Sequence, residues 1–113
     1  MRLETKKYLY DILQAAKSLL QFNTGKSFVD YQGDALLRSA SERQFEIIGE
    51  ALRRLSKEDP ASATQIHEHQ RIIAFRNILI HGYADVDDRV VWDVLQSKLP
   101  RLQQDVEKLL AKD

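Results

Sequence analysis

The chain has 113 residues, of which 43% are hydrophobic and 30% are charged, and its seventeen basic residues balance seventeen acidic ones. This size predicts a single domain over residues 1–113, and the zero net charge argues against tight, non-specific binding of DNA, which depends on neutralising phosphates. The absence of cysteine excludes disulfides, zinc–thiolate sites and cysteine nucleophiles. No apolar run approaches the roughly 20 residues that a membrane helix needs, so we expect a cytoplasmic protein without a membrane partner.

Apolar side chains at three- and four-residue spacing predict a first helix over about residues 3–22. A second, longer helix is predicted over about residues 30–55, with Ser27 or Asp30 as its N-terminal cap. Gly49 lies inside that helix, where glycine costs about 1 kcal/mol relative to alanine. This cost predicts that another helix approaches closely at Gly49.

A third helix is predicted over about residues 63–81, and Gly82 is expected to end it. The apolar residues of this segment are too many for one narrow stripe, which predicts that the helix is buried on more than one side. Asp85 or Asp87 is expected to cap a fourth helix, and Pro100 to lie in the first turn of a fifth. The pattern therefore predicts an all-α fold, an antiparallel bundle of four or five helices.

The stretch of greatest chemical interest is residues 76–83, which read Arg-Asn-Ile-Leu-Ile-His-Gly-Tyr. Arg76 can hold a phosphate group through two parallel hydrogen bonds, and His81 can take up or release a proton near neutral pH. Asn77 lies one helical turn before His81 and could orient its imidazole ring. Arginine, histidine and tyrosine at this spacing are expected by chance roughly 0.01 times in such a chain, so the pattern favours a site that acts on phosphodiesters.

Each residue of this stretch also has a purely structural interpretation. A cation among apolar helix residues is costly unless it is paired, so Arg76 could form a packing salt bridge with Glu46 or Glu50. His81 could place a favourable positive charge at a helix C-terminus. Tyr83 could cover the core and keep its hydroxyl in water.

The pattern Arg-Asn-x-x-x-His followed by Gly-Tyr resembles the signature of HEPN-domain ribonucleases, and its spacing is closer still to that of the HepT-like toxins. Residues 42–51, which include the run Glu-Ile-Ile-Gly-Glu, resemble the second helix of that family. Residues 86–102 resemble its C-terminal segment, so that the resemblance covers nearly the whole chain. The chain departs from the family in its compact length and short second loop.

The resemblance implies a HEPN-like helical bundle that forms a homodimer and cleaves RNA as an endoribonuclease, without a metal or another cofactor. It implies that Arg76 binds the phosphate and stabilises its developing charge, while His81 transfers protons. Two copies would face a shared cleft, so that their two histidines serve as base and acid. Asn77, Glu46 and Glu50 would support these residues.

The same resemblance implies a toxin–antitoxin pair, described as type II-like or type VII. The cognate nucleotidyltransferase antitoxin would transfer AMP to Tyr83, which brings bulk and negative charge close to His81. The upstream residues His67 and His69 are expected at the surface or an interface rather than in catalysis. The alternative interpretation is a non-catalytic helical module that binds a nucleotidyltransferase partner and helps bind nucleotide or substrate.

Overall fold

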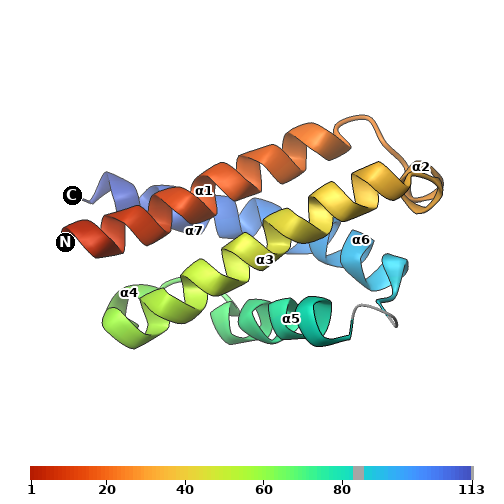
Figure 1. Ribbon diagram of the computed structural model, residues 1–113. Helices are drawn as coiled ribbons and strands as arrows, with labels where there is room; N and C mark the ends of the chain where they lie inside the picture. Colours follow the sequence, from red (N-terminus) through yellow and green to blue (C-terminus); the bar gives the residue numbers. More distant parts are fainter. Residues whose placement is uncertain (83–85, 113) are drawn as a thin grey trace.

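The computed structural model describes residues 1–82 and 86–112, which contain α-helices and no strand. The helices are α1 (Leu3–Asn23), α2 (Phe28–Gly33), α3 (Ala35–Glu58), α4 (Pro60–Ala63), α5 (His69–His81), α6 (Asp88–Ser97) and α7 (Leu99–Ala111) (Figure 1). The expected all-α bundle is confirmed. Helices α1, α3, α5, α6 and α7 correspond to the five predicted ones, and the short helices α2 and α4 are additional.

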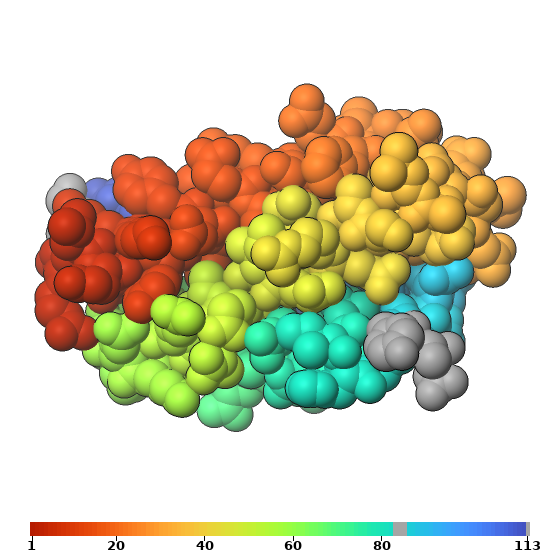
Figure 2. Space-filling model, in the orientation of Figure 1, coloured from red at the N-terminus to blue at the C-terminus, as the bar shows by residue number. Residues whose placement is uncertain are grey.

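Helix α3 runs across the molecule between α1 and α5, and α7 lies behind α1 (Figure 1). Figure 2 shows the face on which α1, α3 and α5 lie side by side. The core is one cluster of apolar side chains, and those with no exposed surface include Leu9, Ile12, Leu19, Ile48, Leu52, Leu55, Ile66 and Val106. Each buried methylene contributes about 0.8 kcal/mol, so this shared cluster is the main force that holds the long helices together.

The predicted second helix starts later than residue 30, because two caps follow one another in the chain. Ser27 accepts a hydrogen bond from the Asp30 backbone at 3.1 Å and the Asp30 side chain accepts one from the Ser27 backbone at 2.9 Å, which closes a capping box on α2. Asp34 then accepts a bond from the Leu37 backbone at 3.0 Å and starts α3. The prediction of Ser27 as a cap is confirmed, but it caps the separate helix α2.

Helix α5 begins well after the start that the sequence pattern predicts. Glu68, the residue before it, has a φ of 57°, in the left-handed region that a non-glycine residue rarely adopts. The Glu68 carboxylate pairs with Lys98 at 2.5 Å, and Asp105 of α7 accepts a hydrogen bond from the His67 backbone at 2.9 Å. Contacts from α7 and from Lys98, which lie far along the chain, therefore stabilise a turn at Glu68 where the local sequence pattern predicts a helix.

The prediction that this helix is buried on more than one side is wrong. Its buried side chains are Ile72, Phe75 and Leu79, which form one stripe. Ile78 lies outside this stripe and is 57% exposed. Helix α5 packs on α3, and its Ile73 is partly buried against the core, so Ile78 is the isoleucine of this helix that stays exposed.

The predicted boundaries at Gly82, Asp87 and Pro100 are confirmed. Gly82 ends α5 and its backbone donates to the Ile78 carbonyl at 2.8 Å, and Asp87 caps α6 by accepting from the Arg89 backbone at 2.8 Å. Pro100 lies in the first turn of α7, where its missing N–H group is not needed. Among the residues described, no helix is both long and apolar enough to cross a bilayer.

Candidate functional site

The crossing of α3 and α5 is the closest helix contact near the predicted motif. A side-chain carbon placed on Gly49 would lie 2.1 Å from the Cβ atom of Arg76 and 2.5 Å from its Cγ atom. Such distances are not tolerated, so only glycine lets α5 come this close. The predicted close approach at Gly49 is confirmed, and Arg76 is the residue that makes it.

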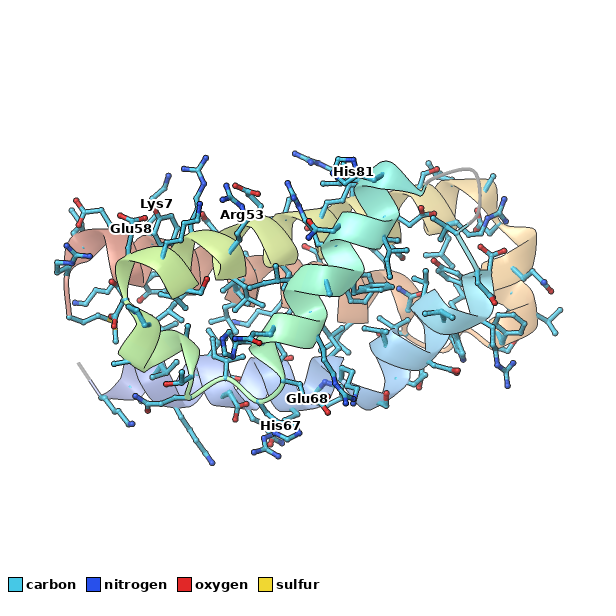
Figure 3. The ribbon with its side chains drawn as sticks, turned by 90° about the horizontal axis from the view of Figure 1, so that it is seen from below. Lys7, Arg53, Glu58, His67, Glu68 and His81 are labelled. Atoms are coloured by element: carbon cyan, nitrogen blue, oxygen red, sulfur yellow. The ribbon has the colours of Figure 1, made fainter. Side chains whose placement is uncertain are left out.

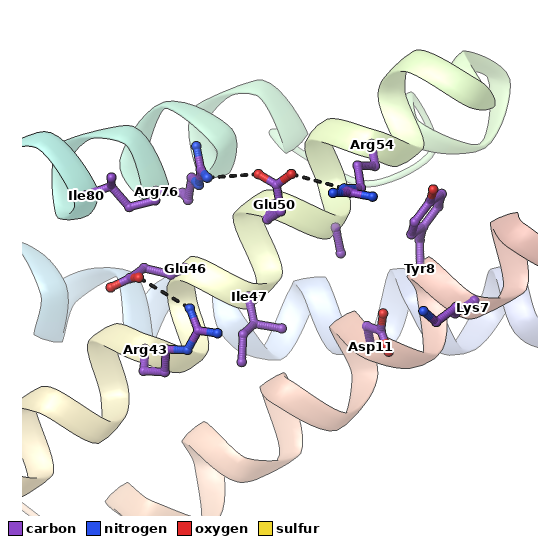
Figure 4. A pocket seen from close by; sticks show the side chains of 11 residues that line it. Lys7, Tyr8, Asp11, Arg43, Glu46, Ile47, Glu50, Arg54, Arg76 and Ile80 are labelled. Atoms are coloured by element: carbon purple, nitrogen blue, oxygen red, sulfur yellow. Dashed lines mark hydrogen bonds and ion pairs between the residues drawn. The ribbon is translucent and has the colours of Figure 1, made fainter.

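Glu50 gathers three guanidinium groups around one carboxylate. Its Oε2 atom lies 2.8 Å from Nη2 of Arg76, and its Oε1 atom accepts a hydrogen bond from Arg54 at 3.1 Å (Figure 4). The same Oε1 atom also accepts a hydrogen bond from Arg53 at 2.7 Å. The hydrogen bonds from Arg53 in the first place, together with those from Arg54 and the charge of Arg76, lower the pKa of Glu50 to about 2. Glu50 therefore stays ionised and anchors Arg76.

The second predicted partner of Arg76 has a different role. Glu46 pairs with Arg43 at 3.6 Å on its own helix, one turn before Glu50 (Figure 4). Both carboxylates line the same cavity as Arg76, but of the two only Glu50 forms an ion pair with Arg76. Helix α5 crosses α3 at Gly49, so the neighbouring Glu50, and not Glu46, is the partner of Arg76.

The remaining donors of Arg76 are only partly used. Its Nη1 atom donates to Oδ1 of Asn77 at 3.0 Å, and its Nε atom is buried with no acceptor among the described residues. No hydrogen bond joins Asn77 to His81 within the described part of the chain, so Asn77 supports the arginine rather than the imidazole. Arg76, whose side chain is 20% exposed, keeps N–H groups that a phosphate could use.

His81 is the last residue of α5 and its side chain is exposed (Figure 3). It follows Arg76 by five positions, which corresponds to about 140° around an α-helix. Arg76 points to α3 (Figure 4), and His81 points to solvent (Figure 3). The two residues therefore share one end of a helix but not one face.

The other histidines lie away from this end. His67 and Glu68 are on the opposite side of the molecule from His81 (Figure 3), and the His67 side chain is 52% exposed. His69 is the first residue of α5, three turns before its end. Tyr83, the predicted AMP acceptor, lies outside the described residues.

A cavity of about 300 Å³ opens beside Arg76, between α1, α3 and α5 (Figure 4). Its charged lining also includes Lys7, Asp11, Arg43, Glu46, Glu50 and Arg54. Sequence reasoning missed the residues from α1, because nothing in the local pattern links them to α5. The spacing of Glu50, Arg53 and Arg54 at three and four residues was a readable sign of the ion cluster.

No group of three or more metal-binding side chains is arranged to hold a metal ion among the described residues. The site offers a fixed guanidinium, an exposed imidazole and a polar cavity. A guanidinium held in place can bind a phosphate and stabilise added negative charge on it. An exposed imidazole can exchange protons with a bound substrate.

The family described as "Ribonuclease HepT-like" matches residues 12–109. The chain belongs to this family. The HepT-like match contains residues 42–51, 76–83 and 86–102, on which the resemblance was drawn, so that resemblance is confirmed. The expectation of an enzyme among the ribonucleases is confirmed at the level of the family.

Relatives of this HepT-like chain cover it almost end to end. A protein of Caldanaerobacter subterraneus subsp. tengcongensis, provisionally named an RNase, is 34% identical over 108 residues, which are 96% of each chain. One of Thermococcus cleftensis, named "Probable ribonuclease HepT", is 34% identical over 112 residues, 96% of this chain and 98% of that protein. One of Methanocaldococcus jannaschii, also provisionally named an RNase, is 29% identical over 104 residues, 92% of this chain and 94% of its own. No solved structure matched the chain.

Proposed function

We propose that this HepT-like protein is a toxin that cleaves RNA by proton transfer, without a metal or another cofactor. The observation that carries the proposal is the position of Arg76, which Glu50 and Asn77 hold at the edge of a cavity of about 300 Å³. A cation already held in place binds a phosphate without further ordering, which favours the charged transition state. His81 supplies the titratable group on the same helix end.

The proposed reaction uses the 2′-hydroxyl of the RNA as nucleophile. One histidine removes the proton of this hydroxyl, and its oxygen attacks the adjacent phosphorus. A second histidine donates a proton to the departing 5′-oxygen, so that the products carry a 2′,3′-cyclic phosphate and a free 5′-hydroxyl. Arg76 stabilises the additional negative charge that the phosphorane carries between these steps.

We infer that a homodimer brings the two histidines together. One chain supplies only one candidate histidine, and His81 lies about 140° around α5 from Arg76. Ile78, one turn before His81, is 57% exposed, and an exposed isoleucine beside a polar site is suited to contact with another chain. A twofold axis near the end of α5 would place the second His81 opposite the first.

We further propose control by a nucleotidyltransferase antitoxin that transfers AMP to Tyr83. The support is the spacing of the motif, in which Tyr83 follows His81 by two residues. An attached nucleotide brings negative charge to the place where the RNA phosphate binds, so it blocks the site sterically and by repulsion. This pair would operate in the cytoplasm, as a single domain over residues 1–113, with RNA and not DNA or a membrane as its target.

Cleavage of RNA by purified, unmodified protein in the presence of a chelator tests the function. We expect His81→Ala and Arg76→Ala to abolish cleavage and His67→Ala, an exposed histidine on the opposite side, to leave it intact. The expected product ends are a cyclic phosphate and a 5′-hydroxyl. Full cleavage by His81→Ala would overturn the assignment, and an inactive wild type that still binds the nucleotidyltransferase would favour the non-catalytic module.

A further inference from the structure

The cavity beside Arg76 extends well beyond the residues that the proposed cleavage uses. From Arg76 and Ile80 on α5 it passes across α3 and reaches Lys7, Tyr8 and Asp11 on α1 (Figure 4). Its volume of about 300 Å³ lies at the small end of the range for ligand pockets. A space of this size suits one nucleotide, held next to a phosphate on Arg76.

The charges of the cavity favour an anionic ligand. Four cationic side chains line it, against the three carboxylates of Asp11, Glu46 and Glu50. Three guanidinium groups already surround Glu50, so its negative charge is compensated within the protein. Lys7 has no ion pair among the described residues, and it remains available to a phosphate.

The apolar part of the lining offers a surface for a base. Tyr8 is partly buried against the core, and its hydroxyl donates a hydrogen bond to the carboxylate of Glu58. This bond ties the phenol ring to the end of α3, and Ile47 lies beside the same cavity. An aromatic ring held in this way is the usual platform on which an unpaired RNA base stacks.

Asp11 provides a carboxylate without an internal role. It is exposed, lines the cavity and forms no hydrogen bond or ion pair within the part of the chain that the structure describes. A carboxylate only accepts hydrogen bonds, so it selects the base edge with the most donors. Guanine offers N1–H and its 2-amino group side by side, which match the two carboxylate oxygens, whereas uracil offers one N–H between two repelling carbonyl groups.

We propose that this cavity binds one guanosine nucleotide of the RNA, adjacent to the phosphate held by Arg76; this inference rests on the proposed function. The base packs on the ring of Tyr8, and its Watson–Crick edge donates two hydrogen bonds to Asp11. Lys7 and Arg43 contact the phosphate of the same nucleotide. The enzyme then cuts RNA at a fixed position relative to a guanosine.

The test is the binding of 5′-GMP and 5′-UMP to the full-length protein, measured by calorimetric titration. We expect the wild type to bind GMP at least about tenfold more tightly than UMP, and Asp11→Asn to lose this preference, because the amide turns one acceptor into a donor. Tyr8→Leu is expected to weaken the binding of both nucleotides. Glu107→Gln removes an exposed, unpaired carboxylate on α7 and is expected to leave both affinities unchanged.

Mapping the ends of cleaved RNA separates this inference from the proposed function. Wild-type cuts that keep a constant distance from guanosine, and that scatter in Asp11→Asn, support the guanosine site. Equal binding of GMP and UMP, or identical cut sites in the wild type and Asp11→Asn, would overturn it even if cleavage is efficient. Tight, Asp11-dependent GMP binding without any cleavage would instead refute the ribonuclease mechanism and leave the nucleotide site standing.

Discussion

Replacing Glu50 with glutamine tests whether this carboxylate holds Arg76 in place. The substitution keeps the size of the side chain and removes the charge that Arg53, Arg54 and Arg76 share. Arg76 is then partly buried and has lost its ion pair with Glu50. Its Nε atom already lacks an acceptor among the described residues, so no other carboxylate compensates for this loss there. We expect both the stability of the fold and the cleavage of RNA to fall.

The pKa of Glu50 sets the size of the effect on stability. A decrease of the pKa from the ordinary value of 4.5 to about 2 corresponds to at most about 3 to 4 kcal/mol, since one pKa unit is about 1.4 kcal/mol. The side chain is 30% exposed, so water screens part of the interaction. We expect the free energy of unfolding to decrease by about 1–2 kcal/mol and cleavage to slow by about tenfold.

Urea denaturation followed by circular dichroism measures this loss as a function of pH. The pKa of Glu50 is lower in the folded state, so its contribution is complete above 4.5 and is lost as the pH falls toward about 2. The difference between wild type and Glu50→Gln should therefore be constant near neutral pH and shrink steadily below about pH 5. A difference that does not change between neutral and acidic pH would show that the lost charge is not its cause.

Glu46→Gln is the matched control for this experiment. Glu46 lies one turn earlier on α3, its side chain is 28% exposed, and its only ion pair within the described part of the chain is with Arg43, at 3.6 Å. A surface pair of this kind contributes little, so we expect a change below about 0.5 kcal/mol and nearly normal cleavage. Equal losses in both variants would refute the specific role of Glu50.

Three further outcomes are expected. Gly49→Ala should destabilise the fold by about 1–2 kcal/mol, because overpacking against Arg76 exceeds the gain in helix propensity. Gly33 has open space around it, so Gly33→Ala should not destabilise the fold, and thermal denaturation compares the two variants. If each site needs two histidines, mixing the wild type with a ninefold excess of His81→Ala chains should reduce the cleavage rate per wild-type chain to about one tenth, because about one wild-type chain in ten then has a wild-type partner. An unchanged rate per wild-type chain would contradict the dimeric mechanism. Intact-mass spectrometry after co-expression with the nucleotidyltransferase should show added AMP units that disappear in Tyr83→Phe, and unmodified protein bound to that partner would point to inhibition by binding alone.

The sequence predicted those helix ends that depend on local chemistry. Gly82, Asp87 and Pro100 act through the conformation of their own backbone or through a bond to a residue two or three positions away, so their roles can be read from the chain. The helix break at Asp34 was also local, but the apolar pattern continued through it and hid the second cap. The left-handed turn at Glu68 was not readable, because Lys98 and α7 hold it from far along the chain.

The candidate site likewise combines features that the sequence predicts with features that only the tertiary structure decides. The sequence by itself determined the helical fold, which follows from the periodicity of its apolar residues, and it indicated the family through the resemblance of its motif to that of known proteins. Only the tertiary structure decided that Arg76 pairs with Glu50 rather than Glu46, because both glutamates lie on one side of α3 and the close crossing at Gly49 selects between them. It also brought Lys7, Tyr8 and Asp11 of α1 to the cavity beside Arg76, because the apolar faces of α1 and α5 both pack on α3.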